Sequence, residues 1–223
     1  MATLTLTNIR SMIRDELNEQ NTNVLTTTEL NSIINDGYKD VAVKTMGYAL
    51  NKTITTVDGQ NIFAIPTTTA RAFKVNFLDH NNYGVQRTSP TTVGFAAATV
   101  SSGKGTPGYY FQWGDKITVD PLVDSTAAGN TTTAFCSCYP AAVMSSDSDT
   151  PSSLPPEFHD CIVDFAVAFA CLKLRRWGDA GIAYNRYIGN VQQRRFEYFQ
   201  AVADRRSARE VPDTVKVEYK NNG

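Results

Sequence analysis

Apolar residues recur at helical spacing over the first fifty residues of the chain. The first stripe runs through Leu6, Ile9, Met12, Ile13 and Leu17. This spacing is typical of a helix with one buried face, and Thr5 or Thr7 can cap its start. Thr26 and Glu29 then form a capping box in front of a second apolar stripe. We therefore predict two helices joined by a short loop.

From about residue 51 the pattern changes to short β-like runs between turn residues. In one run, Phe73, Val75 and Phe77 alternate with polar residues, which predicts a strand with these three on one face. Hairpins are predicted around 58–59 (Asp-Gly) and around 114–115 (Gly-Asp). Short strands with frequent turns are typical of a small antiparallel sandwich or barrel. We expect the polar stretch 143–153 that follows to be mobile.

The most apolar passage of the chain comes late, between Ile162 and Leu174. It leaves almost no polar face, and a helix that is hydrophobic on all sides must be buried. Pro156 suits the first turn of this helix. Gly178 is expected to end it, and Asp179 to cap a long helix that reaches about Ser207. We predict that the core of the bundle contains Ile162, Phe165, Phe169 and Leu172.

These elements predict an α+β fold in which a β module interrupts a helical bundle. Neither helical pair has enough apolar surface of its own to enclose the passage 162–174, so we expect the two pairs to form one bundle of about four helices. The bundle comprises residues 1–50 and 154–209, the inserted antiparallel β module spans 51–153, and a C-terminal extension covers 210–223. A helix that is apolar on all sides still has one face uncovered in such a bundle. We expect that face to contact another subunit.

Composition narrows the possible environments. The chain has 223 residues and a formal net charge of −1, which gives no reason to invoke nucleic acid or an anionic membrane. We find no signal-peptide pattern at the start and no apolar run long enough to span a bilayer, so we expect no membrane contact. The four cysteines lack zinc-site spacing. We expect free, mostly buried thiols in a reducing compartment.

Candidate catalytic chemistry is sparse in this sequence. The two histidines, His80 and His159, are expected to be surface or capping residues. No nucleophile elbow, zinc-protease motif, phosphate loop or dinucleotide fingerprint occurs. We therefore predict no catalytic residue, no metal ligand and no cofactor.

Basic residues are concentrated near the end of the chain. Residues 172–209 contain nine basic and three acidic side chains, although the whole chain is nearly neutral. A solvated helix face would explain this, and so would a nucleic-acid surface or a docking surface for an acidic protein. We favour the protein partner because arginine predominates and pairs with carboxylates through two hydrogen bonds. The candidate contact residues are Arg194, Arg195, Arg205 and Arg206.

The segment 211–220 has a strand pattern beyond the long helix. Val215, Val217 and Tyr219 alternate with polar residues. A single strand is not stable alone in water, so it must be disordered or must add to the edge of another sheet. We expect this segment to be disordered in the free subunit and to order on a partner.

Three stretches, in this order, resemble the head-to-tail adaptor proteins of tailed bacteriophages, which form the connector ring beneath the portal. They are TTTELNSIINDGYKDV (26–41), GTPGYYFQWGDKITVDP (105–121) and LPPEFHDCIVDFAVAFACLKL (154–174). A long helix rich in Tyr, Arg and Phe closes the pattern.

The resemblance implies a structural subunit that catalyses no reaction. Such proteins form a homo-oligomeric ring, commonly of twelve, that docks on the portal protein and extends the DNA channel. The ring provides the platform for a tail nozzle or tail tube protein, and double-stranded DNA passes through it without sequence-specific contact. The expected location is the virion, assembled in the host cytoplasm. The arginines and the segment 211–220 would then contact the portal or a neighbouring subunit.

Two other functions remain open at this stage. One is a tail-terminator or neck protein, which would join different partners in the particle. The other is an enzymatic or carbohydrate-binding module of a virion, with Tyr109, Tyr110, Phe111 and Trp113 as a sugar platform. Tyr109, Phe111 and Trp113 would share one strand face, and the commoner role of such a face is core packing.

Overall fold

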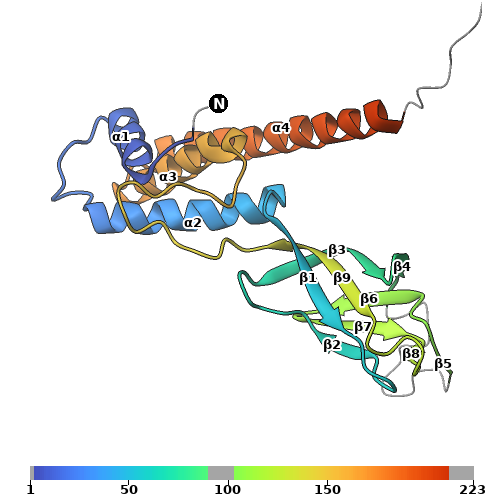
Figure 1. The fold of residues 1–223 in the computed structure, drawn as a ribbon. Helices are drawn as coiled ribbons and strands as arrows, with labels where there is room; N and C mark the ends of the chain where they lie inside the picture. Colours follow the sequence, from blue (N-terminus) through green and yellow to red (C-terminus); the bar gives the residue numbers. More distant parts are fainter. Residues whose placement is uncertain (1–2, 90–102, 211–223) are drawn as a thin grey trace, which may run out of the picture.

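The computed structural model describes residues 3–89 and 103–210, with the side chains of 201–210 excepted. The described residues form four α-helices and a curled seven-stranded sheet beside one end of the helices (Figure 1). The α+β fold class predicted from the sequence is confirmed.

Four helices are described, and the first two begin where the capping residues predict. The four are α1 (Leu6–Leu17), α2 (Thr27–Thr45), α3 (His159–Lys173) and α4 (Trp177–Glu210), with a 3₁₀ turn η1 at Pro156–Phe158. Thr5 caps α1 and accepts a hydrogen bond from the backbone N–H of Asn8. Thr26 and Glu29 form the expected capping box at the start of α2. These side chains satisfy backbone N–H groups that have no partner within the helix.

Helix α3 is the centre of the bundle, since it packs against α1, α2 and α4. The boundary between α3 and α4 lies at other residues than predicted. Arg175 adopts a left-handed conformation with φ of 58°, and α4 already begins at Trp177. Gly178 and Asp179 therefore lie in the first turn of α4. The chain turns at Arg175 through a Schellman-type helix end, in which the N–H of Arg176 donates to the carbonyl oxygen of Cys171 at 2.9 Å and the N–H of Arg175 donates to that of Leu172 at 3.1 Å.

The stretch 143–153 is held against the helices, so the prediction that it is mobile is wrong. The backbone N–H of Leu6 donates to the carbonyl oxygen of Asp149 at 2.7 Å. The Asn35 amide donates to the carbonyl oxygen of Met144 at 2.9 Å and accepts from its N–H at 2.7 Å. The Met144 side chain is buried in the helical core. The stretch thus supplies partners for the first turn of α1, which its polar composition did not indicate.

The main sheet has the strand order β1-β9-β3-β4-β6-β7-β2. Its strands are β1 (Ala49–Thr55), β2 (Ile62–Ala64), β3 (Ala72–His80), β4 (Tyr83–Arg87), β6 (Tyr109–Trp113), β7 (Lys116–Asp120) and β9 (Thr131–Cys138). All neighbouring pairs are antiparallel except β4 and β6, which are parallel. The sheet is therefore mixed, whereas the sequence predicted an antiparallel one. A second parallel pair joins β5 (Lys104–Gly105) to β8 (Leu122–Val123).

One of the two predicted hairpins forms and the other does not. Strands β6 and β7 pair around Gly114, whose φ is 59°. Strands β1 and β2 flank Gly59 but pair with β9 and β7, at opposite ends of the strand order. The N–H of Gly59 donates to the carbonyl oxygen of Val123 at 2.8 Å. The turn thus docks on β8, and the two strands leave it toward different partners.

Strand β3 does not alternate as predicted. Its pairing with β9 has two register shifts, between Ala72 and Lys74 and between Val75 and Phe77. Each bulge adds one residue and moves the following side chains to the other face. Val75 and Leu78 are consequently buried, whereas Phe77 is 46% exposed on the outer face.

The buried side chains form two separate clusters. One lies among the helices and includes Met144 and Leu154; the other lies inside the curled sheet. The chain leaves the helices through β1 and returns through β9, and these two strands are paired along their whole length (Figure 1). We keep the division into a bundle and an inserted β module as a proposal, with residues 144–153 packed on the helical side.

Candidate functional site

Four aromatic rings form a row that crosses from α3 to α4. Phe169 stacks on Phe165 with ring centroids 4.3 Å apart, and Phe165 meets Tyr187 edge-on at 5.4 Å. Tyr187 is 5.9 Å from Tyr184. The two inner rings are buried, but Phe169 and Tyr184 are 38% and 41% exposed. This aromatic row, Phe169–Phe165–Tyr187–Tyr184, therefore reaches the surface at both ends.

The row corrects part of the predicted bundle core. Ile162 and Phe165 lie in the helical core, but Phe169 and Leu172 are each 38% exposed. Placing these last two in the core is thus wrong for the single chain. The other helices cover α3 on the sides that carry Ile162 and Phe165, and they leave the side of its last turns open. Gly37 allows α2 to approach closely, because a Cβ there would lie 2.7 Å from the ring of Phe165.

A polar cluster fixes the row to α2. The Tyr187 hydroxyl donates to the Asp40 carboxylate, which also pairs with Lys44 Nζ at 2.6 Å. The same ammonium lies 4.8 Å from the centre of the Tyr187 ring, a favourable cation–π distance. Burial and the bond to Asp40 raise the pKa of Tyr187. The hydroxyl therefore remains a donor that joins α4 to α2.

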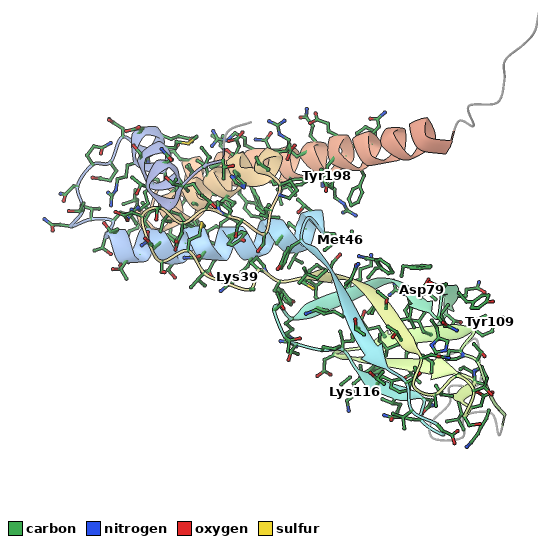
Figure 2. The ribbon with its side chains drawn as sticks, viewed as in Figure 1. Lys39, Met46, Asp79, Tyr109, Lys116 and Tyr198 are labelled. Atoms are coloured by element: carbon green, nitrogen blue, oxygen red, sulfur yellow. The ribbon has the colours of Figure 1, made fainter. Side chains whose placement is uncertain are left out.

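A groove separates the middle of α4 from the outer face of the sheet. Two hollows of about 570 and 450 Å³ adjoin there and share Met46, Lys74 and Arg195. Their apolar walls include Met46, Phe73, Ile188, Val191, Tyr198 and Phe199. Figure 2 labels Met46 at the end of α2 and Tyr198 on α4, on the two sides of this space. We call it the α4–sheet groove.

The groove carries two cations that have no acidic partner among the described residues. Lys74 Nζ lies 3.5 Å from the sulfur of Met46. The Arg195 guanidinium lies 5.9 Å from the centre of the Phe199 ring. Both charges therefore border apolar surface and remain available to a carboxylate from outside the chain.

The other two arginines of α4 whose side chains are described, Arg186 and Arg194, form ion pairs within the chain. Arg186 pairs with Glu16 at 2.5 Å and with Asp164 at 2.8 Å. Arg194 lies 3.5 Å from Glu197 and 4.0 Å from Asp160. Of the predicted contact residues whose side chains are described, Arg195 is thus the free one. The remaining predicted contacts lie outside the described side chains: Arg205, Arg206, Val215, Val217 and Tyr219.

Both histidines are buried, whereas the sequence led us to expect surface or capping residues. Nδ1 of His159 accepts the N–H of Leu4 at 3.2 Å, so its Nε2 donates to the carbonyl oxygen of Leu154 at 3.2 Å. Burial lowers the pKa of His159. Nδ1 of His80 lies 2.7 Å from the Thr132 hydroxyl. Both rings hold segments of the fold together.

Metal and membrane sites find no support in the part of the chain that the structure describes. Within the described side chains of residues 3–89 and 103–200, no group of three or more His, Cys, Asp or Glu is placed to hold a metal ion. The helices in these ranges do not combine the length and hydrophobicity needed to cross a membrane.

The proposed sugar platform is divided between two faces of β6. Tyr110 is buried inside the curled sheet, whereas Trp113 is 75% exposed and Tyr109 is also exposed. The core-packing residue of this strand is therefore Tyr110, not the set of alternate residues predicted to share the core face. Tyr109 and Trp113 remain on an outer face of the sheet.

The cysteines should be slow to react in the native protein. All four are free and buried. Burial raises the pKa of Cys136 to about 11 and that of Cys161 to about 12, so very little reactive thiolate exists at pH 8. We expect DTNB to label native protein slowly at pH 8 and to titrate all four thiols after denaturation. Rapid labelling of the native protein would contradict this burial.

The α4–sheet groove was not foreseen from the sequence. Its walls come from the end of α2, from β3 and from α4, which are far apart in the chain. The sequence offered one signal for the groove, the apolar pair Tyr198 and Phe199. This pair lies in a late part of the helix where few residues are needed for the helical core. Periodicity cannot show which sheet face such a pair meets.

Comparison with known proteins identifies one family. The family model described as SU10 adaptor protein matches residues 4–216, which is nearly the whole chain. No match was found among the curated proteins.

Proposed function

Because the chain belongs to the SU10 adaptor protein family, which comprises phage head-to-tail adaptors, we propose that it is a ring-forming connector subunit. The ring docks on the portal protein, extends the DNA channel and provides the platform on which a tail nozzle or tail tube protein assembles. Twelve copies remain the expected number. DNA passes without sequence-specific contact, in keeping with the nearly neutral net charge of −1.

The observation that carries this proposal is the uncovered apolar end of the aromatic row. Phe169 and Leu172 are half-exposed on the central helix of the bundle, beside buried Phe165. Contiguous exposed apolar surface commonly marks a protein interface. When two different patches meet between successive copies, the contact is head-to-tail, and it closes into a ring if the rotation allows. We assign the Phe169–Leu172 surface to such a contact.

The basic end of α4 is the second proposed contact. Arg195 has no acidic partner within the described part of the chain, so a neighbouring subunit or the portal can supply one. Arg194 contributes less because Glu197 already neutralises it. We extend the same role to Arg205 and Arg206, which follow on the same helix.

The proposal is tested by the mass of the native protein, alone and mixed with portal. We expect a ring alone or a ring–portal complex in the mixture. A chain that stays monomeric in both conditions contradicts the function. Electron microscopy of the particle then distinguishes a ring under the portal from a tail-terminator or neck position.

Phe169→Glu should abolish ring formation while the subunit stays folded. Phe169 is already partly in water, so the free energy of unfolding should fall by no more than about 1–2 kcal/mol. A carboxylate buried in the subunit contact without a partner is far more costly than in water. Native mass spectrometry measures the loss. Trp113→Glu, which adds the same charge on exposed β6, is the matched control. Full-size rings from Phe169→Glu would contradict the assignment.

A further inference from the structure

We infer that the α4–sheet groove binds the segment 213–219 of a neighbouring copy of this chain. The inference deepens the proposed ring and rests on it. It assigns a receptor to a segment whose sequence has a strand pattern.

The chemistry of the groove suits this segment. The walls are apolar and aromatic, and the two cations that they flank, Lys74 and Arg195, have no carboxylate within the described chain. In an extended segment, Asp213, Val215, Val217 and Tyr219 lie on one side. Three apolar side chains can therefore face the walls while Asp213 meets a cation. A carboxylate pairs more strongly with a cation at the edge of apolar surface than in bulk water, because the local dielectric is lower.

The lengths also agree. The wall contributed by α4 runs from Ile188 to Phe199, which is about 17 Å at the rise of an α-helix. The segment from Asp213 to Tyr219 spans about 20 Å when extended. One such segment fills the groove from end to end.

The same copy cannot place its own segment there. Helix α4 ends at Glu210, so Arg195 lies about 22 Å back along the helix axis. Reversing the chain takes a four-residue turn, which leaves residues 214–219 to run back. These cover about 17 Å, so Tyr219 would only reach the level of Phe199. Val215 and Val217 would remain outside the groove, and the occupant must come from another copy.

Such an exchange makes every subunit both donor and receptor. Each copy then gives one segment to its neighbour and receives one, which is a head-to-tail contact of the type that closes rings. Ordering the segment costs conformational entropy. The groove should therefore be filled in the ring and released when copies separate.

Disulfide trapping between two full-length variants tests the inference. One variant carries Gln192→Cys at the groove and the other carries Val217→Cys; they are co-expressed, purified and mildly oxidised. The native thiols are buried and contribute little background. We expect a disulfide-linked dimer that neither variant forms alone. Lys116→Cys, at an exposed site on β7, replaces Gln192→Cys as the matched control. Adding Lys74→Glu and Arg195→Glu to the groove variant should reduce the yield of disulfide-linked dimer by about tenfold. This corresponds to a loss of about 1.4 kcal/mol in the free energy of binding.

The outcomes separate this inference from the proposed function. Rings without the cross-link would overturn the groove assignment and leave the connector function standing. A monomeric internal disulfide in a chain carrying both cysteines, without dimer, would show binding within one copy and would overturn it too. Protection of Val217→Cys only after portal is added would assign the segment to the portal instead. A chain that is monomeric with and without portal, and gives no cross-link, would contradict both.

Discussion

Phe158→Ala is expected to lower the free energy of unfolding by about 3–5 kcal/mol, through lost burial and the cavity left behind. Phe158 is fully buried in η1, and its ring centre lies 5.4 Å from that of Tyr198 on α4. A Cβ at Gly47, just beyond α2, would lie 3.5 Å from the same ring. The ring of Phe158 thus lies where η1, α4 and the segment after α2 meet. These three segments cannot all move inward to fill the cavity that its removal leaves. Urea unfolding of the full chain measures the effect.

Phe169→Ala is the matched control for this substitution. It removes the same side chain from a site that is already partly in water, so the loss for the free subunit should be about 1–2 kcal/mol. An equal loss at both positions would mean that Phe169 is covered within the single subunit. In that case the aromatic row would offer no open surface for assembly.

Arg186→Leu is expected to cost about 3 kcal/mol of unfolding free energy, because it leaves a nearly buried carboxylate without its cation. Asp164 is 8% exposed on the central helix. Its two oxygens are held by Arg186 at 2.8 Å and by Asn190 at 2.6 Å. Arg186 is itself partly exposed, so water offsets part of the loss. Thermal or urea unfolding measures it.

The double variant Asp164→Leu with Arg186→Leu is the control. Replacing both members of a buried ion pair by apolar residues is often close to neutral. We therefore expect the double variant to be more stable than Arg186→Leu alone. A double variant less stable than the single one would show that the charges contribute net stability to the bundle.

Local signals in the sequence predicted the helices well. The capping box at Thr26 and Glu29 and the apolar run of α3 depend on neighbours three or four residues away. Both features can therefore be recognised in the sequence without knowledge of the tertiary structure. The centre of the bundle followed from the same run, because a helix without a polar face has to be covered.

Strand pairing and faces were less predictable because distant segments decide them. The turn at Gly59 exists, but β1 and β2 found β9 and β7 as partners. The bulges in β3 moved Phe77 outward, and no residue in that strand signals them. Phe165 and Phe169 share one helical stripe, yet only the first has α2 against it. The groove around Lys74 could not be derived for the same reason.

The paired strands β1 and β9 also determine how the molecule carries mechanical load. The chain passes from the helices into the sheet through β1 and returns through β9. Both strands are joined to the helical part at the same end of their ladder, where Ala49 pairs with Ser137. A pull between helices and sheet draws both strands in the same direction, so it does not peel one from the other. Tension is shared between two backbones and the hydrogen bonds between them stay closed. Opening this ladder requires a force that separates the end of α2 from residues 139–144.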